Sequence, residues 1–240
     1  MRSIVLAHQV DFSGWRDAAR RLCLDGVPPE QAHFSVGTPD DLFADAPELA
    51  STGSAAPPPA GAFTVTRQLM ELAQSAIQAR DPERFSLLYG LVWRAQHGER
   101  RIAEVVTDAA VQRALRLSQS VRRDTHKMRA FVRFREVRDD AGLRYVSWFE
   151  PEHFIVESNA DFFARRFATM VFTILTPYRS VHWTGEALEF GPGAEPGAVP
   201  DDDALERYWR TYFSAIFNPA RLKVAAMRSE MPKKYWRNLP

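Results

Sequence analysis

The sequence contains a single cysteine, Cys23, among its 240 residues. One thiol excludes an intrachain disulfide, a zinc site built from cysteines and an iron–sulfur cluster held by this chain alone, because each of them needs several thiolates. Long apolar runs are also missing, since no stretch approaches the roughly 18 residues of a membrane-spanning helix and the apolar opening is too short for the core of a signal peptide. We therefore expect a cytoplasmic protein.

An excess of one charge sign is missing as well. The chain holds 31 bases and 30 acids, for a formal net charge of +1, whereas proteins that bind polyanions usually carry a basic excess. The charges are unevenly spread, however. Residues 94–138 hold twelve bases and five acids, residues 206–240 hold eight bases and two acids, and residues 25–61 hold six acids and no Lys or Arg. The neutral total therefore does not exclude a nucleic-acid partner.

The common cofactor signatures are missing too. The sequence has no His-Glu-x-x-His motif, no phosphate-binding or dinucleotide glycine pattern and no deaminase-type zinc motif, so it predicts neither a cofactor nor a metal site. Three residues remain as candidates for acid–base chemistry, because imidazole and carboxylate groups transfer protons near neutral pH: His126, Glu150 and His153. Whether the chain is an enzyme stays open at this point.

Apolar periodicity predicts an α+β fold. We expect a helical N-terminal half packed against a mainly antiparallel sheet, with a C-terminal amphipathic helix. The expected helices cover residues 15–24, 64–80, 82–96, 108–127, 159–167 and 205–217, and the expected strands cover residues 3–7, 129–138, 143–149, 170–176, 180–183 and 187–190. The strands at 129–138 and 143–149 surround a turn and so predict a hairpin.

Composition divides the chain into three parts. Residues 43–62 are rich in Ala, Pro, Gly and Ser and have no apolar period, which is typical of a linker or a long loop. An N-terminal strand–helix unit precedes this segment over residues 1–42. An α+β domain with a basic C-terminal tail follows it over residues 63–240.

A basic surface is predicted in the middle of the chain. Four cations recur at intervals that place them on one side of the helix expected at 108–127, and four more residues alternate along the strand expected at 129–138. The predicted nucleic-acid contacts are Arg113, Arg116, Arg123, Lys127, Arg129, Phe131, Arg133 and Arg135. In this interpretation the cations bind phosphates and Phe131 stacks on an unpaired base. The alternative is that the strand arginines pair with neighbouring acids and that Phe131 is buried.

Four segments carry a family resemblance. Residues 122–136 (RRDTHKMRAFVRFRE), 148–153 (WFEPEH) and 161–167 (DFFARRF), followed by Trp209 and residues 218–221 (NPAR), resemble a bacterial family of DNA metabolism proteins. The resemblance covers nearly the whole chain. It implies a DNA context, because members are encoded beside a radical-SAM protein linked to DNA modification or repair and are often fused upstream of a uracil-DNA glycosylase-like domain. It brings no catalytic residues.

Three hypotheses follow. The first is a DNA-repair or DNA-metabolism accessory domain that binds single-stranded or damaged DNA through the Arg-rich helix and strand. The second is an enzyme that acts on a nucleotide or base through His126, Glu150 and His153 in a shared pocket. The third is an adaptor that docks a radical-SAM or glycosylase-like partner through aromatic residues and the basic tail at residues 221–240. None of the three involves a membrane.

Overall fold

The computed structural model describes residues 1–37, 63–139 and 142–195. The chain forms two compact units, residues 1–122 and residues 123–240, and the division falls inside the long helix α4 (Ala109–Phe131). The fold is α+β, with most of the helices in the N-terminal half and a five-stranded, mostly antiparallel sheet in the second unit. The predicted fold class is therefore confirmed.

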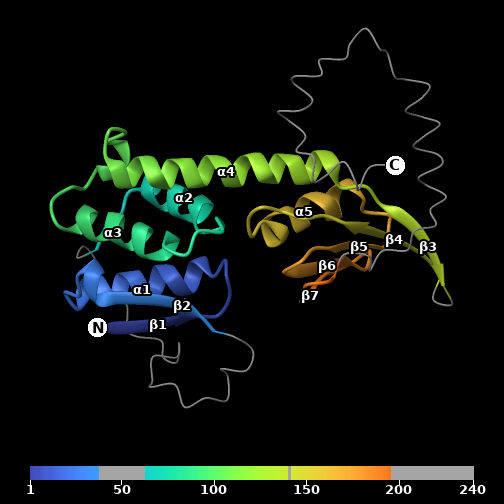
Figure 1. Ribbon diagram of the computed structural model, residues 1–240, viewed down its shortest axis with the longest axis horizontal. Coiled ribbons are helices and arrows are strands. Elements are labelled where there is room, and N and C mark those ends of the chain that lie inside the picture. The colour runs from blue at the N-terminus through green and yellow to red at the C-terminus, as the bar shows by residue number, and fades with distance from the viewer. Residues whose placement is uncertain (38–62, 140–141, 196–240) are drawn as a thin grey trace, which may run out of the picture. The chain divides into compact units, whose positions relative to one another are not determined.

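The first unit opens with a strand–helix–strand arrangement. Strand β1 (Arg2–Leu6) pairs in parallel with β2 (Ala32–Val36), and helix α1 (Phe12–Leu24) connects them beside the pair (Figure 1). Our sequence analysis missed β2. The N-cap of α1 is Asp11, whose carboxylate accepts hydrogen bonds from the Gly14 amide at 2.8 Å and from the Ser13 hydroxyl at 3.2 Å. Because Asp11 is the Ncap residue itself, its side chain reaches the first unsatisfied amides of the helix.

Two further helices complete the core of the first unit. Helices α2 (Arg67–Ala76) and α3 (Arg84–Gln96) confirm the predicted periodicity, with Leu88 and Tyr89 fully buried. Trp15 of α1 is also buried, and its indole nitrogen donates to the Phe85 carbonyl at 3.2 Å. Apolar side chains from both sides of the 38–62 gap therefore share one core. The domain limits that composition predicts at 42 and 62 stay a prediction.

The strand expected at 129–138 is wrong in its first part, where helix α4 continues. The helix continues to Phe131, and β3 begins only at Arg135 (Arg135–Asp139). The buried residues Val121, Asp124, Met128 and Val132 recur at intervals of three and four, and the Val132 amide still donates to the Met128 carbonyl at 3.0 Å. The helical period thus extends through the segment that also alternates like a strand, and cooperative helix propagation prevails there.

The second unit is built around one sheet with strand order β3-β4-β5-β6-β7. The predicted hairpin of β3 and β4 (Gly142–Trp148) is confirmed, and among the described strands of this sheet only β4 and β5 pair in parallel. The remaining strands are β5 (Phe172–Leu175), β6 (Arg179–Trp183) and β7 (Leu188–Pro192). Phe172, Ile174 and Val181 are fully buried and share one face by register.

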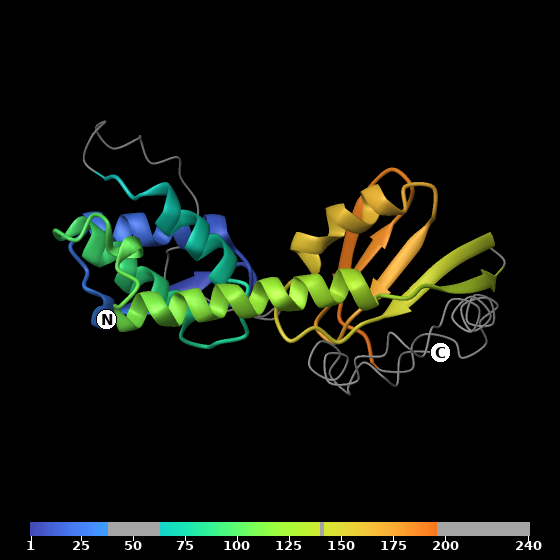
Figure 2. The same cartoon turned by 90° about the horizontal axis from the view of Figure 1, so that it is seen from above.

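Helix α5 (Val156–Arg166) covers that face of the sheet (Figures 1 and 2). Phe163 of α5 is buried, and Phe134 meets both Phe163 and Phe172, at centroid distances of 6.3 and 5.1 Å. The first amide of α5, that of Val156, donates to the Tyr178 hydroxyl at 2.8 Å. Burial is the main reason that the pKa of Tyr178 is raised.

Three predicted segments lie outside the described residues: the loop or linker at 43–62, the amphipathic helix at 205–217 and the basic tail at 221–240. Within the ranges that the structure describes, no helix combines the length and the apolar character needed to cross a membrane.

Candidate nucleic-acid interface

Arg113 lies at the start of the predicted basic surface, but acids surround it. One Arg113 Nη atom contacts Glu83 at 2.7 Å and the other contacts Asp81 at 3.0 Å. The hydrogen bonds that Arg113 donates to Glu83 and to Asp81, in that order of effect, raise the pKa of Arg113. Both Nη atoms of Arg113 are therefore already engaged by carboxylates.

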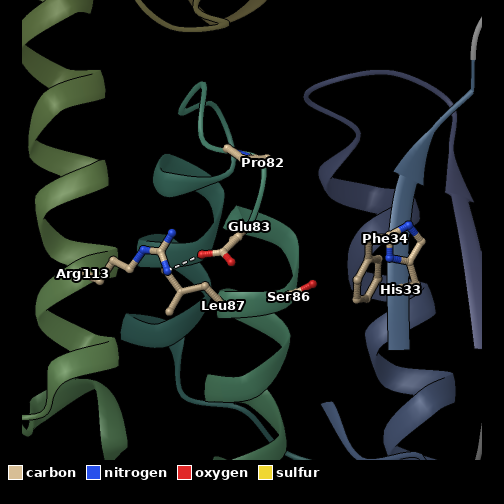
Figure 3. A pocket seen from close by; sticks show the side chains of 7 residues that line it. All are labelled: His33, Phe34, Pro82, Glu83, Ser86, Leu87 and Arg113. Atoms are coloured by element: carbon tan, nitrogen blue, oxygen red, sulfur yellow. Dashed lines mark ion pairs between the residues drawn. The ribbon is translucent and has the colours of Figure 1, made fainter. Parts of the chain in front are cut away.

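The ion pair of Arg113 with Glu83 borders the pocket in Figure 3. The pocket measures about 380 Å³ and lies between β2 and the helices α3 and α4, all within the first unit. Figure 3 shows Arg113 directed at Glu83, whereas His33 and Phe34 come from β2 across the pocket. None of the three candidate acid–base residues lines it.

The other cations of the predicted surface lie farther along α4 and differ from Arg113. Arg116 and Arg123 are exposed, and Lys127 is half-buried. Within the described residues these three side chains have no ion pair or hydrogen bond. The only acid between residues 122 and 131 is Asp124, which is 1% exposed and whose carboxylate accepts the His153 amide hydrogen at 2.9 Å. The exposed part of this stretch of α4 therefore carries cations and no acid.

Arg129 lies in the last turn of α4 and is exposed, yet part of its side chain is fixed. Its Nε atom donates to the Asn159 Oδ1 atom at 2.7 Å, and its guanidinium carbon lies 4.6 Å from the ring centroid of Phe162. Asn159 is itself fully buried, and its Nδ2 atom donates to the Ile155 carbonyl at 3.0 Å. Both Nη atoms of Arg129 have no hydrogen-bond partner within the described part of the chain.

Helix α5 adds two cations that our sequence analysis did not assign to the site. Arg165 and Arg166 are exposed and follow Phe162 by three and four residues, so they lie on the Phe162 side of α5. They form no ion pair within the described residues. Both also lie in the last turn of the helix, where a cation compensates the negative end of the helix dipole.

The three remaining predicted contacts are more enclosed. Phe131 is half-buried in the last helical turn, away from any strand face. Arg133 follows the helix, and its Nη1 atom donates to the Ala130 and Val132 carbonyls at 2.7 and 2.9 Å. Burial lowers the pKa of Arg133. Arg135 is half-buried at the start of β3. These residues contribute more to the helix–strand junction than to an open basic face.

The structure gives the three candidate acid–base residues different surroundings. His126 is exposed on the solvent side of α4. Glu150 accepts a hydrogen bond from the Trp148 indole at 3.0 Å, and the His153 amide is bound by Asp124. The described residues contain no group of three or more His, Cys, Asp or Glu side chains that would hold a metal ion.

Comparison with known families places this interface in a defined domain. A family model described as a domain of unknown function, DUF4130, matches residues 82–240 and so covers more than half of the chain. The chain belongs to the DUF4130 family. The DUF4130 match includes every predicted nucleic-acid contact and every candidate acid–base residue. The search of the curated proteins and the search of the solved structures each found no match.

Proposed function

We propose that this DUF4130 protein is an accessory module of DNA metabolism that binds single-stranded or damaged DNA through the second half of α4. One observation carries the proposal: Arg123, Lys127 and Arg129 present cationic atoms that no acid of the described residues neutralises. The only acid in that part of the helix is turned into the core.

The energetic argument is counterion release. A cation that contacts a phosphate displaces a condensed counterion. The gain in binding free energy is largest when the cation is not already paired with an acid of the protein. Arg113 illustrates the opposite case, because Asp81 and Glu83 already hold its two Nη atoms. We therefore limit the proposed surface to the second half of α4 and the neighbouring arginines of α5.

The family resemblance supports a DNA context for such a surface. The resemblance associates relatives with a radical-SAM protein linked to DNA modification or repair and with a uracil-DNA glycosylase-like domain. An accessory module that retains the strand would supply substrate to such a partner. Docking to either partner is part of the proposal and needs its own interaction measurement.

A binding experiment with paired variants tests the proposal. Fluorescence anisotropy of a labelled single-stranded oligonucleotide gives the affinity as a function of salt concentration. The double substitution Arg123→Gln and Lys127→Gln removes two phosphate contacts, so the slope of log affinity against log salt should fall in magnitude by about 1.4.

The matched control removes two exposed arginines that are already paired with acids, Arg67 with Glu71 and Arg101 with Glu104. The double substitution Arg67→Gln and Arg101→Gln has the same change in net charge and should leave the slope unchanged. Equal losses in both double variants would mean that only net charge matters, and would overturn the assignment to α4.

A further inference from the structure

The side chain of Arg129 is held in one orientation by two independent contacts. Asn159 binds its Nε atom, and the Phe162 ring lies under its guanidinium plane. The Phe162 ring is held in turn by an edge contact with Phe163, at a centroid distance of 5.3 Å and an interplanar angle of 84°. Phe163 and Asn159 are both buried, so the support belongs to the packed part of α5.

We infer that Arg129 binds one backbone phosphate and sets the register of the strand on the surface, an inference that rests on the proposed function. Its guanidinium is held in place before binding, and its two Nη groups form a fork of parallel donors. Its Nε edge is occupied by Asn159, whereas Nη1 and Nη2 have no partner in the described residues. Two parallel N–H donors match two oxygens of a phosphate.

Pre-positioning gives this fork an advantage over the other cations of the surface. A long side chain that becomes ordered on binding loses conformational freedom, and this loss opposes binding. Arg129 has already lost part of that freedom through Asn159 and Phe162. Arg123 and Lys127 have no comparable support, so they should contribute charge rather than geometry.

A phosphate explains the surroundings of Arg129 better than a carboxylate does. The cations of α4 and the exposed Arg165 and Arg166 of α5 extend the positive charge beyond Arg129. In the sequence of α5, the acid nearest to Phe162 is Asp161, which directly precedes it. Positive charge spread over two helices suits a ligand with repeated negative charges, and the strand backbone provides them at regular intervals.

Substitution of Arg129 separates charge from geometry. Arg129→Ala should weaken binding of the single-stranded oligonucleotide about tenfold at moderate salt and lower the magnitude of the salt slope by about 0.7. Arg129→Lys keeps the charge but lacks the fork, so it should restore the wild-type slope while the affinity stays about fivefold weaker. Arg129→Lys with wild-type affinity would overturn the fork.

A double-mutant cycle tests Phe162 as a positioning residue. Phe162→Leu retains an apolar side chain but removes the ring under Arg129, and should weaken binding about threefold through the lost ordering of Arg129. In the Arg129→Ala background the same substitution should have no further effect. An equal loss in both backgrounds would show that Phe162 acts on the fold alone, and would overturn its role.

Two outcomes distinguish this inference from the proposed function. Absence of binding by the wild-type protein would overturn both. If the wild-type protein binds and Arg129→Ala leaves that binding unchanged, only the phosphate-binding role of Arg129 is overturned. A poly-glutamate peptide serves as the competitor. If it displaces the oligonucleotide at an equal concentration of charge, the fork binds carboxylates, and this result would overturn the claim that Arg129 binds a phosphate.

Discussion

Arg84 is a buried cation whose role is structural. Its side chain donates to the carbonyls of Gln9, Ile77 and Asp81 at 2.8–2.9 Å, and it is 4% exposed. Burial lowers its pKa to about 10, so the guanidinium remains charged at neutral pH. One side chain therefore joins the connection between β1 and α1 to the connection between α2 and α3.

Replacement of this arginine should destabilise the first unit. Arg84→Met leaves buried carbonyls without a donor, and we expect the free energy of unfolding to fall by about 3 kcal/mol. Urea denaturation followed by circular dichroism measures this change. The control Arg101→Met removes only an exposed pair with Glu104 and should cost less than about 0.5 kcal/mol. Equal effects of the two substitutions would contradict the role of Arg84.

Cys23 and Tyr89 make the first unit sensitive to alkaline pH. Burial raises the pKa of Cys23 from 9.0 to about 11, and burial together with the nearby Cys23 raises the pKa of Tyr89. The unfolded chain therefore loses these protons at lower pH than the folded chain does. Stability should be complete below about pH 9 and should decline as the pH rises towards 11.

The melting temperature between pH 8 and pH 11 tests this expectation. Cys23→Ala removes one of the two groups, so its melting temperature should fall less steeply over that interval than that of the wild type. A parallel fall in both proteins would exclude a contribution from Cys23. The raised pKa also predicts that alkylation of the folded protein at pH 8 is slower than alkylation of the unfolded chain.

At the scale of elements, α4 shows what local sequence patterns can and cannot predict. Apolar spacing predicts the helix at 108–127 and the hairpin that follows, because both patterns are local. The predicted boundary between the helix and the strand was wrong, because residues 129–134 fit both the helical period and the strand period. Strand β2 was missed because its partner β1 lies about 30 residues earlier in the chain, and five residues of mixed polarity carry little signal by themselves.

The buried acid of α4 connects this helix to the segment after β4. The Asp124 carboxylate accepts the His153 amide hydrogen at 2.9 Å and is almost completely buried. Asp124→Ala should lower the free energy of unfolding by about 2 kcal/mol and speed hydrogen exchange at the His153 amide. Asp124→Asn keeps an acceptor oxygen, so its free energy of unfolding should fall by less. Unchanged exchange in Asp124→Ala would contradict this connection.

At the scale of the molecule, the distribution of charge is more informative than its total. The net charge of +1 averages acidic and basic blocks. Helical spacing predicted Arg123 and Lys127 and strand alternation predicted Arg129, whereas Arg165 and Arg166 were not predicted. Neither pattern predicted which cations bind other side chains, because Asp81 lies 32 residues before Arg113 and Asn159 lies 30 residues after Arg129. Such partners depend on the tertiary fold, so the sequence patterns predicted several of the cations but not their roles.

The salt dependence of single-stranded DNA binding by the wild-type protein tests the central claim most directly. If the cations of α4 and α5 at positions 123, 127, 129, 165 and 166 each contact a phosphate, log affinity should fall against log salt with a slope of about −3.5. Binding should be strongest at low salt. A slope near zero, or no detectable binding at about 50 mM salt, would contradict a polyanion-binding role for this surface.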